Sequence, residues 1–179
     1  MKIGIDISQL AYPNTGVANY LKSLVENMVN ADSDNEYVLF FSSLRRNFQF
    51  SIFNFQSNNN ITIKQFKFPS KLLDLVWNRL HIAPIEWFIG DVDVFITSDW
   101  TEPPVKRTKK ATIIYDMVVY KYPEETAQII KNVQKRKNEW VRKESNIVFA
   151  ISESAKNDII EILGISEGKI QVIYPGITL

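Results

Sequence analysis

The chain closes with the stretch NIVFAISESAKNDIIEILGISEGKIQVIYPGITL, residues 146–179, and this stretch indicates the fold class. A nearly continuous apolar run at 147–151 predicts a strand that helices bury on both faces. Ser152 stands where a helix N-cap is expected, and Gly164 predicts the end of that helix. A second strand is expected at 169–174. The stretch therefore predicts one strand–helix–strand unit of an α/β protein.

The same alternation of strand and helix runs through the rest of the chain. Strands are predicted at 2–7, 36–42, 61–66, 93–97 and 111–116, and helices at 16–30 and 124–144. The segment 70–88 is either one apolar helix or two helices broken at Pro84, and 45–60 is either a strand or an irregular aromatic patch. The alternation predicts an α/β fold with a Rossmann-like, doubly wound, mostly parallel sheet.

Composition narrows the function classes. A chain of 179 residues with 45% hydrophobic and 23% charged residues suits one globular domain. The formal net charge of +1 is too small to attract the negatively charged backbone of a nucleic acid, so no nucleic-acid partner is expected. One histidine and no cysteine predict no metal site, and the absence of a GxGxxG motif predicts no dinucleotide cofactor. The first residues lack the order of a signal peptide, so we expect a cytoplasmic protein.

Polar residues that follow the predicted strands are the candidates for a binding site, because parallel sheets bind ligands at the carboxyl ends of their strands. The first group is Asn14, Thr15 and Gly16, which precede the helix at 16–30. Backbone N–H groups at such a helix start can bind an anion. The alternative is a plain turn in which Asn14 or Thr15 caps the helix.

Two further groups follow later strands. Ser98, Asp99 and Trp100 come after the strand at 93–97 and combine a hydroxyl, a carboxylate and an indole, which suits sugar recognition by hydrogen bonds and stacking. They equally suit a polar loop with one packed aromatic ring. Tyr115 and Asp116 end the strand at 111–116, and Asp116 is either a site residue or a cap of the following loop or helix.

Basic and apolar surfaces leave two more alternatives open. Lysines and arginines crowd the loop at 106–110 and the helix at 124–144, either as a solvated face or as a contact for anionic lipid headgroups. The apolar segment 72–88, with Trp77 and Trp87, is either a core helix or a membrane-surface contact.

The order of residues in the last stretch resembles the sequences of a known family. Residues 150–159 (AISESAKNDI), 163–165 (LGI) and 169–177 (KIQVIYPGI) are similar to one part of the retaining, GT-B fold glycosyltransferases of family 4, and the resemblance extends over 2–179. It implies that 1–174 is the N-terminal, acceptor-binding, Rossmann-like half of a GT-B fold. It also implies that 175–179 begins a linker to a C-terminal, donor-binding domain that is missing from this chain.

The resemblance implies a function. The complete enzyme is expected to move a sugar from a nucleotide sugar to a hydroxyl of a glycan or lipid-linked glycan, with retention of configuration and without a metal or cofactor. The nucleotide sugar would bind mainly through the missing domain, so this chain alone would be inactive. Peripheral contact with the inner face of the membrane is one possibility that the family offers. The alternative is a non-catalytic acceptor-binding subunit or module of a two-part glycosyltransferase.

The resemblance also assigns roles to single residues. Gly16 matches a family glycine that lies near the donor phosphates and the acceptor. Asp116 is the best candidate for a catalytic residue, and Tyr115 stands where many members carry a histidine that contacts the sugar. A phenol can donate a hydrogen bond to a sugar but does not change protonation near neutral pH.

Overall fold

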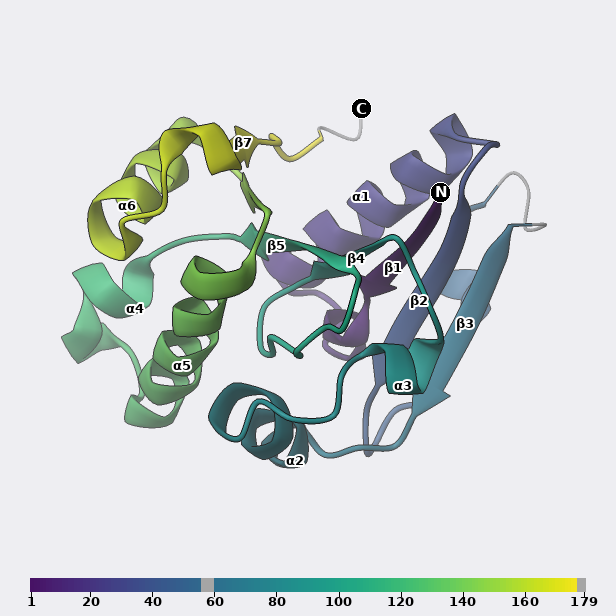
Figure 1. Ribbon diagram of the computed structural model, residues 1–179, viewed down its shortest axis with the longest axis horizontal. Coiled ribbons are helices and arrows are strands. Elements are labelled where there is room, and N and C mark those ends of the chain that lie inside the picture. The colour runs from purple at the N-terminus through teal and green to yellow at the C-terminus, as the bar shows by residue number, and fades with distance from the viewer. Residues whose placement is uncertain (56–59, 177–179) are drawn as a thin grey trace.

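A computed structural model of the protein describes residues 1–55 and 60–176, which contain one seven-stranded parallel sheet (Figure 1). The strand order is β3-β2-β1-β4-β5-β6-β7. The strands are β1 (Lys2–Asp6), β2 (Glu36–Ser42), β3 (Ile61–Phe66), β4 (Val94–Thr97), β5 (Lys109–Ile114), β6 (Ile147–Ala150) and β7 (Ile170–Val172). The order reverses direction at β1 and β4, which places a topological switch point between them.

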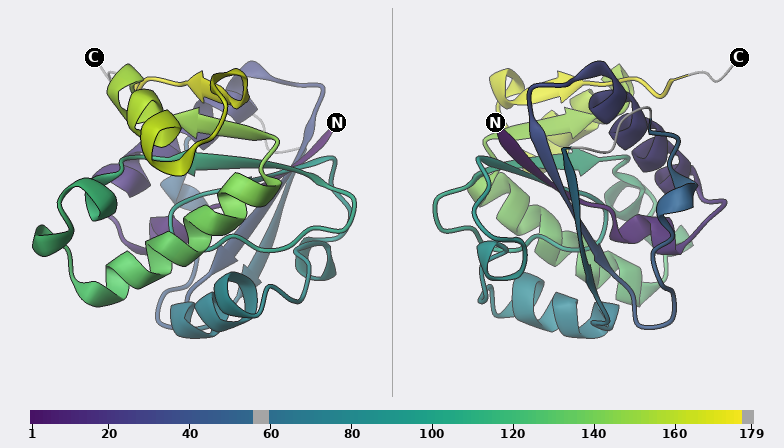
Figure 2. Two further views of the ribbon diagram at one scale, coloured as in Figure 1. Left: turned by 60° about the vertical axis from the view of Figure 1, so that its left-hand side comes forward. Right: turned by 90° about the vertical axis from the view of Figure 1, so that its right-hand side faces the viewer.

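Helices cover both faces of the sheet (Figure 2). The α-helices are α1 (Gly16–Ala31), α2 (Ser70–Leu73), α3 (Glu86–Ile89), α4 (Val118–Lys121), α5 (Gln128–Glu144) and α6 (Glu153–Leu163). The remaining helical segments are η1 (Ser8–Ala11), η2 (Phe50–Ile52), the π-helical η3 (Asp74–Arg79), η4 (Pro123–Glu125) and η5 (Glu167–Lys169). The expected Rossmann-like, doubly wound α/β fold is confirmed, and the sheet is parallel throughout.

Strand β2 shows why the apolar runs are continuous. Successive side chains of a strand point to opposite faces of the sheet. Tyr37, Leu39 and Phe41 pack into the core beneath α1. Val38 and Phe40 pack on the other face with residues of α2, η3 and α3. Because both faces are covered, no position in the middle of the strand can be polar without a buried partner.

Two segments settle alternatives that the sequence left open. The described residues of the segment 45–60, namely 45–55 and 60, are irregular apart from η2, and Phe48 and Phe53 among them pack with Phe41 of β2 as an aromatic patch. The segment 70–88 is divided into α2, η3 and α3. The break begins at Leu80, before Pro84, because His81 and Ala83 adopt left-handed backbone angles.

The long helix starts later than the sequence indicated. We expected a helix over 124–144, but α5 begins at Gln128, and η4 and an extended residue, Thr126, precede it. Pro123 stands at the first position of η4, where its missing N–H costs no hydrogen bond. The turn of direction between η4 and α5 brings the start of α5 to the carboxyl edge of the sheet.

The final described residues return to α1. The Tyr20 hydroxyl on α1 donates a hydrogen bond of 3.0 Å to the carbonyl of Ile173, just after β7. Of the linker expected at 175–179, residues 177–179 lie outside the described part of the chain. The division into 1–174 and 175–179 therefore stays a prediction.

The position of Gly4 allows a test of how tightly the core packs against strand β1. An alanine Cβ at this position would lie 2.7 Å from Cδ2 of Phe95 and 2.9 Å from Cδ1 of Ile89, so the core must shift to admit it. We expect Gly4→Ala to lower the free energy of unfolding by about 1–3 kcal/mol, measured by urea denaturation. Gly168→Ala is the matched control, because its Cβ would meet no atom within 4 Å. Equal stability of the two variants would contradict the packing described here.

Candidate binding site

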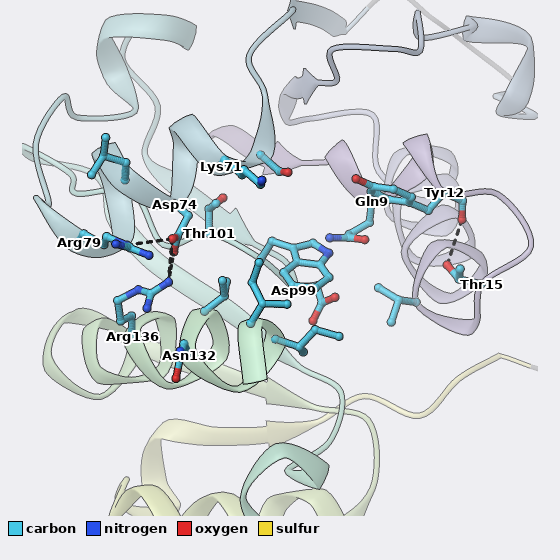
Figure 3. Close-up of a pocket in the computed structure, with 17 residues that line it drawn as sticks. Gln9, Tyr12, Thr15, Lys71, Asp74, Arg79, Asp99, Thr101, Asn132 and Arg136 are labelled. Atoms are coloured by element: carbon cyan, nitrogen blue, oxygen red, sulfur yellow. Dashed lines mark hydrogen bonds and ion pairs between the residues drawn. The ribbon is translucent and has the colours of Figure 1, made fainter. Parts of the chain in front are cut away.

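Two adjoining cavities lie where the residues after β1, β4 and β5 meet. The larger, of about 820 Å³, is bounded by η1 and α1, by α2 and η3, by the loop after β4, and by α5 (Figure 3). The smaller, of about 290 Å³, lies between the loop after β5 and α5. Both are lined by Val17, Asp99, Trp100 and Ile130, so they form one continuous groove. We call the two cavities together the carboxyl-edge groove, after their place at the carboxyl edge of the sheet.

Asn78 holds one wall of this groove. Its amide nitrogen donates to the Trp100 carbonyl at 2.9 Å and to Asp74 at 3.0 Å, while its amide oxygen accepts from the Glu102 N–H at 3.0 Å. Asn78 is buried, so these bonds are shielded from water. They join η3 to the loop after β4 and fix the position of Trp100.

A buried ion pair lies behind that wall. Lys110 is 1% exposed, and its Nζ lies 3.1 Å from Glu102 and 2.8 Å from Glu144. The Glu102 carboxylate also accepts hydrogen bonds from Thr97 at 2.6 Å and from Thr112 at 3.1 Å. The charge of Glu102, which is completely buried, is thus matched by a cation and by hydroxyl donors. The sequence showed Lys110 only as part of a basic loop, and the solvated-face interpretation is wrong for this residue.

Five of the eight candidate residues line the carboxyl-edge groove. Thr15 lines the larger cavity, Tyr115 and Asp116 line the smaller, and Asp99 and Trp100 line both. The other three, Asn14, Gly16 and Ser98, lie beside it without forming its lining.

In the first group the capping interpretation is confirmed, and the anion site at the start of α1 stays a prediction. Thr15 caps α1, since its side-chain oxygen accepts from the Ala18 N–H at 3.2 Å. Asn14 adopts a left-handed conformation with φ of 70°. A Cβ added at Gly16 would meet no atom within 4 Å, so the space over the start of α1 is open.

Tyr115 is buried at the inner end of the smaller cavity. Its hydroxyl lies 3.1 Å from the Ser98 hydroxyl, and its ring meets Tyr20 edge to face at 5.5 Å between centroids. Burial raises the pKa of the Tyr115 phenol, so it stays neutral throughout the physiological range. It can donate or accept a hydrogen bond there but cannot carry charge.

The two aspartates differ in environment. Asp99 accepts a hydrogen bond from the Gln134 amide at 2.9 Å, and burial raises the pKa of its carboxyl group. Asp116 is exposed, lines the smaller cavity and accepts a hydrogen bond of 3.0 Å from the N–H of Val118, the first residue of α4, whose N-cap is Met117. Each carboxylate retains lone pairs for a further donor, because one carboxylate accepts about four hydrogen bonds.

Helix α5 contributes residues that the sequence interpretation missed. Gln134, Lys137 and Asn138 line the smaller cavity from one face of this helix, at a spacing of three and four residues. Lys137 is 2% exposed, so it does not belong to a solvated face, and burial lowers the pKa of its ammonium group. The helical spacing of these polar residues was the signal that could have identified them.

Among the described residues, one long hydrogen bond holds the Lys137 ammonium group. Its hydrogen bond to the Ile113 carbonyl is long, at 3.4 Å, while the carboxylates of Glu102, Asp99 and Asp6 favour its charged form. An ammonium group has three N–H donors. Lys137 is therefore available to donate to an oxygen atom in the cavity.

Lys110 can be tested by mutation. Lys110→Met removes the cation between Glu102 and Glu144 and leaves Glu102 buried without a counter-charge. We expect the free energy of unfolding to fall by about 3–5 kcal/mol in urea titrations. Lys109→Met changes the exposed neighbour on the same strand and should stay within about 0.5 kcal/mol of the parent protein. If both variants unfold at the same urea concentration, the pair does not stabilise the wall of the groove.

Two features are absent from the described residues. Neither a helix long and apolar enough to cross a bilayer nor a group of three or more metal-ligating side chains occurs among them.

Comparison with known proteins places the chain in a family. No curated protein matches it. Among solved structures, UDP-GlcNAc 2-epimerase from Methanocaldococcus jannaschii is similar at a TM-score of 0.49 and 13% identity, over 97% of this chain and 45% of the epimerase. The chain thus spans less than half the length of that protein. The family model of Glycosyltransferase Family 4 matches residues 14–179, nearly the whole sequence, and the chain therefore belongs to Glycosyltransferase Family 4.

Proposed function

We propose that the carboxyl-edge groove binds the acceptor sugar of a glycosyl transfer. The observation that carries the proposal is the set of polar groups around the smaller cavity. Asp99 and Asp116 supply hydrogen-bond acceptors, Lys137 supplies a buried donor, and the Trp100 indole stands beside them. A sugar hydroxyl is both a donor and an acceptor, so a pocket that offers both, next to an aromatic ring, has the chemistry to orient one.

The chain would then be the acceptor side of a glycosyltransferase. Family membership supports nucleotide-sugar and acceptor substrates in general. We propose that a sugar passes from a nucleotide sugar to a hydroxyl of a glycan or lipid-linked glycan, with retention of configuration and no cofactor. The nucleotide sugar would be held mainly by a further domain that follows the linker at 175–179, and 1–174 alone would be inactive. Within the groove, Asp116 remains the best candidate for a residue that touches the reacting hydroxyl.

A second candidate function shares the same groove. A non-catalytic subunit could bind the acceptor and present it to a separate catalytic partner. The neutral, buried Tyr115 favours this candidate, because a phenol with a raised pKa cannot act as a base near neutral pH. The two functions differ in whether a complete protein that contains this domain transfers sugar on its own.

We also propose that one face of the molecule touches a membrane. Trp87 is 65% exposed, and Leu72, Leu80 and Ile82 on the same segment are exposed as well. The Lys106 ammonium group lies over the Trp87 ring at 5.3 Å. Exposed apolar side chains beside lysine suit the boundary of an anionic lipid surface. Trp77, by contrast, is buried, so the segment serves the core and the surface together. Peripheral attachment at the inner, cytoplasmic face of a membrane would follow.

The proposal predicts that this chain binds simple glycosides but not nucleotide sugars. Chemical-shift titrations with methyl and phenyl glycosides should move the signals of Asp99, Trp100 and Asp116. Calorimetry with uridine and guanosine diphosphate sugars should show no affinity better than roughly millimolar, about 4 kcal/mol. Micromolar binding of a nucleotide sugar would show that the donor site is already present in this chain.

Matched variants assign the glycoside site. Asp99→Asn and Asp116→Asn keep the size of the side chain and an oxygen for the bonds from Gln134 and Val118, so stability should change little. Each should weaken glycoside binding roughly tenfold, about 1.4 kcal/mol, because a charged acceptor is replaced by a neutral one. Asp91→Asn, exposed and remote from the groove lining, is the control. Unchanged binding in both groove variants would remove the aspartates from the site.

A further inference from the structure

One end of the larger cavity carries an excess of positive charge. Lys71, Arg79 and Arg136 line it with the Asp74 carboxylate, and these four residues have a formal charge of +2. With Asp99 included, the lining of the whole cavity has a formal charge of +1 (Figure 3). The nearest other acid of the lining, Asp99, is engaged with Gln134 toward the smaller cavity. This end of the cavity is therefore cationic even after its internal ion pairs are counted.

Asp74 orients the two arginines without using up their donors. Its carboxylate accepts from Nη2 of Arg136 at 2.7 and 3.0 Å and from Nε of Arg79 at 3.3 Å. Each guanidinium carries five N–H donors. Among the described residues, Arg136 Nε is buried without a hydrogen-bond partner, and no carboxylate pairs with Lys71. Donors thus remain for an anion that is not part of this chain.

The backbone brings these charges together. Lys71, Asp74 and Arg79 follow one another on α2 and η3, and the π-helical turn of η3 shifts Arg79 relative to a regular α-helix. Arg136 comes from α5, which lies against η3. Arg79 on η3 and Arg136 on α5 therefore meet at the Asp74 carboxylate, and Lys71 lines the same cavity from α2.

Much of the remaining lining of the cavity is apolar and exposed to solvent. Tyr12 is 52% exposed, Leu75 is 44% exposed, and Ile129 is 64% exposed, although all three line the same cavity. Covering apolar surface of this kind stabilises a complex by about 25 cal/mol for each Å² removed from water. A ligand that fills the cavity would thus present an apolar or ring-shaped body to these side chains and an anionic group to the arginines.

We propose that the cationic end binds a phosphate group of the acceptor and that Tyr12, Leu75 and Ile129 pack against the body of the same molecule. A phosphate monoester carries a charge close to −2 near neutral pH and three strong acceptor oxygens, so it can accept from all three basic side chains, whereas a carboxylate offers only two oxygens. Arginine forks also fit the oxygens of a phosphate in pairs. The inference rests on the proposed function, because it names the class of acceptor that the groove takes.

Phenyl phosphate is the probe for this site, with inorganic phosphate and phenol as its two halves. We expect the 179-residue chain to bind phenyl phosphate at least tenfold more tightly than either half, measured by calorimetry at constant ionic strength. Lys71→Gln and Arg79→Gln should each weaken that binding at least fivefold, because each removes one charged donor. Arg142→Gln, exposed on α5 and outside the groove lining, should leave it unchanged.

A vesicle assay distinguishes a soluble phosphate from a lipid phosphate. Co-sedimentation with phosphatidylcholine vesicles that contain phosphatidic acid should depend on Lys71 and Arg79 if the acceptor is a lipid phosphate. Vesicle binding that both variants retain, with phenyl phosphate binding lost, assigns the site to a soluble phosphorylated acceptor. If the variants lose neither, the inference is wrong. Should glycosides still bind through Asp99 and Asp116 in that case, the proposed function stands and only the anionic acceptor is excluded.

Discussion

The buried pair between Glu102 and Lys110 is the interaction on which the rest of the structure depends. Strand β5 carries Lys110, the loop after β4 carries Glu102, and neither charge reaches solvent. A buried carboxylate without a partner would cost several kcal/mol, so the loop must adopt the path that meets the lysine. That path brings Glu102 to Asn78 and Trp100 to the groove. The pair thus gives the loop after β4 a single conformation.

The path of the loop after β4 also links the two ends of the carboxyl-edge groove. Asn78 holds the loop after β4 on one side and Asp74 on the other, and Asp74 in turn orients Arg79 and Arg136. Lys137 stands on α5 one residue after Arg136 and reaches the smaller cavity instead. Neighbouring basic residues of one helix therefore serve different parts of the groove. A rigid wall of this kind suits the recognition of a ligand without a large rearrangement on binding.

Much of the candidate site could be predicted from residues that follow strands, because a parallel sheet collects those residues at one edge. Asp99, Trp100, Tyr115 and Asp116 all line the groove for that reason. The groups contributed by helices could not be placed in this way. Lys137 and Arg142 look alike in the sequence of α5, yet one is buried at the cavity and the other is exposed, because only the packing of α5 on the sheet distinguishes its faces.

The sequence by itself determined the α/β class and the positions of most strands, since these rest on local apolar runs and helix caps. It also determined the family, since the resemblance rests on the order of residues. Strands β2 and β3 begin and end where their patterns predict. The tertiary structure alone decided the break at Leu80, the late start of α5 and the burial of Lys110 and Lys137. These features depend on partners distant in the chain, such as Glu102 for Lys110 and Glu144 for His81. A local pattern records the preference of a segment, whereas the environment of a charge is set by whatever the fold brings beside it.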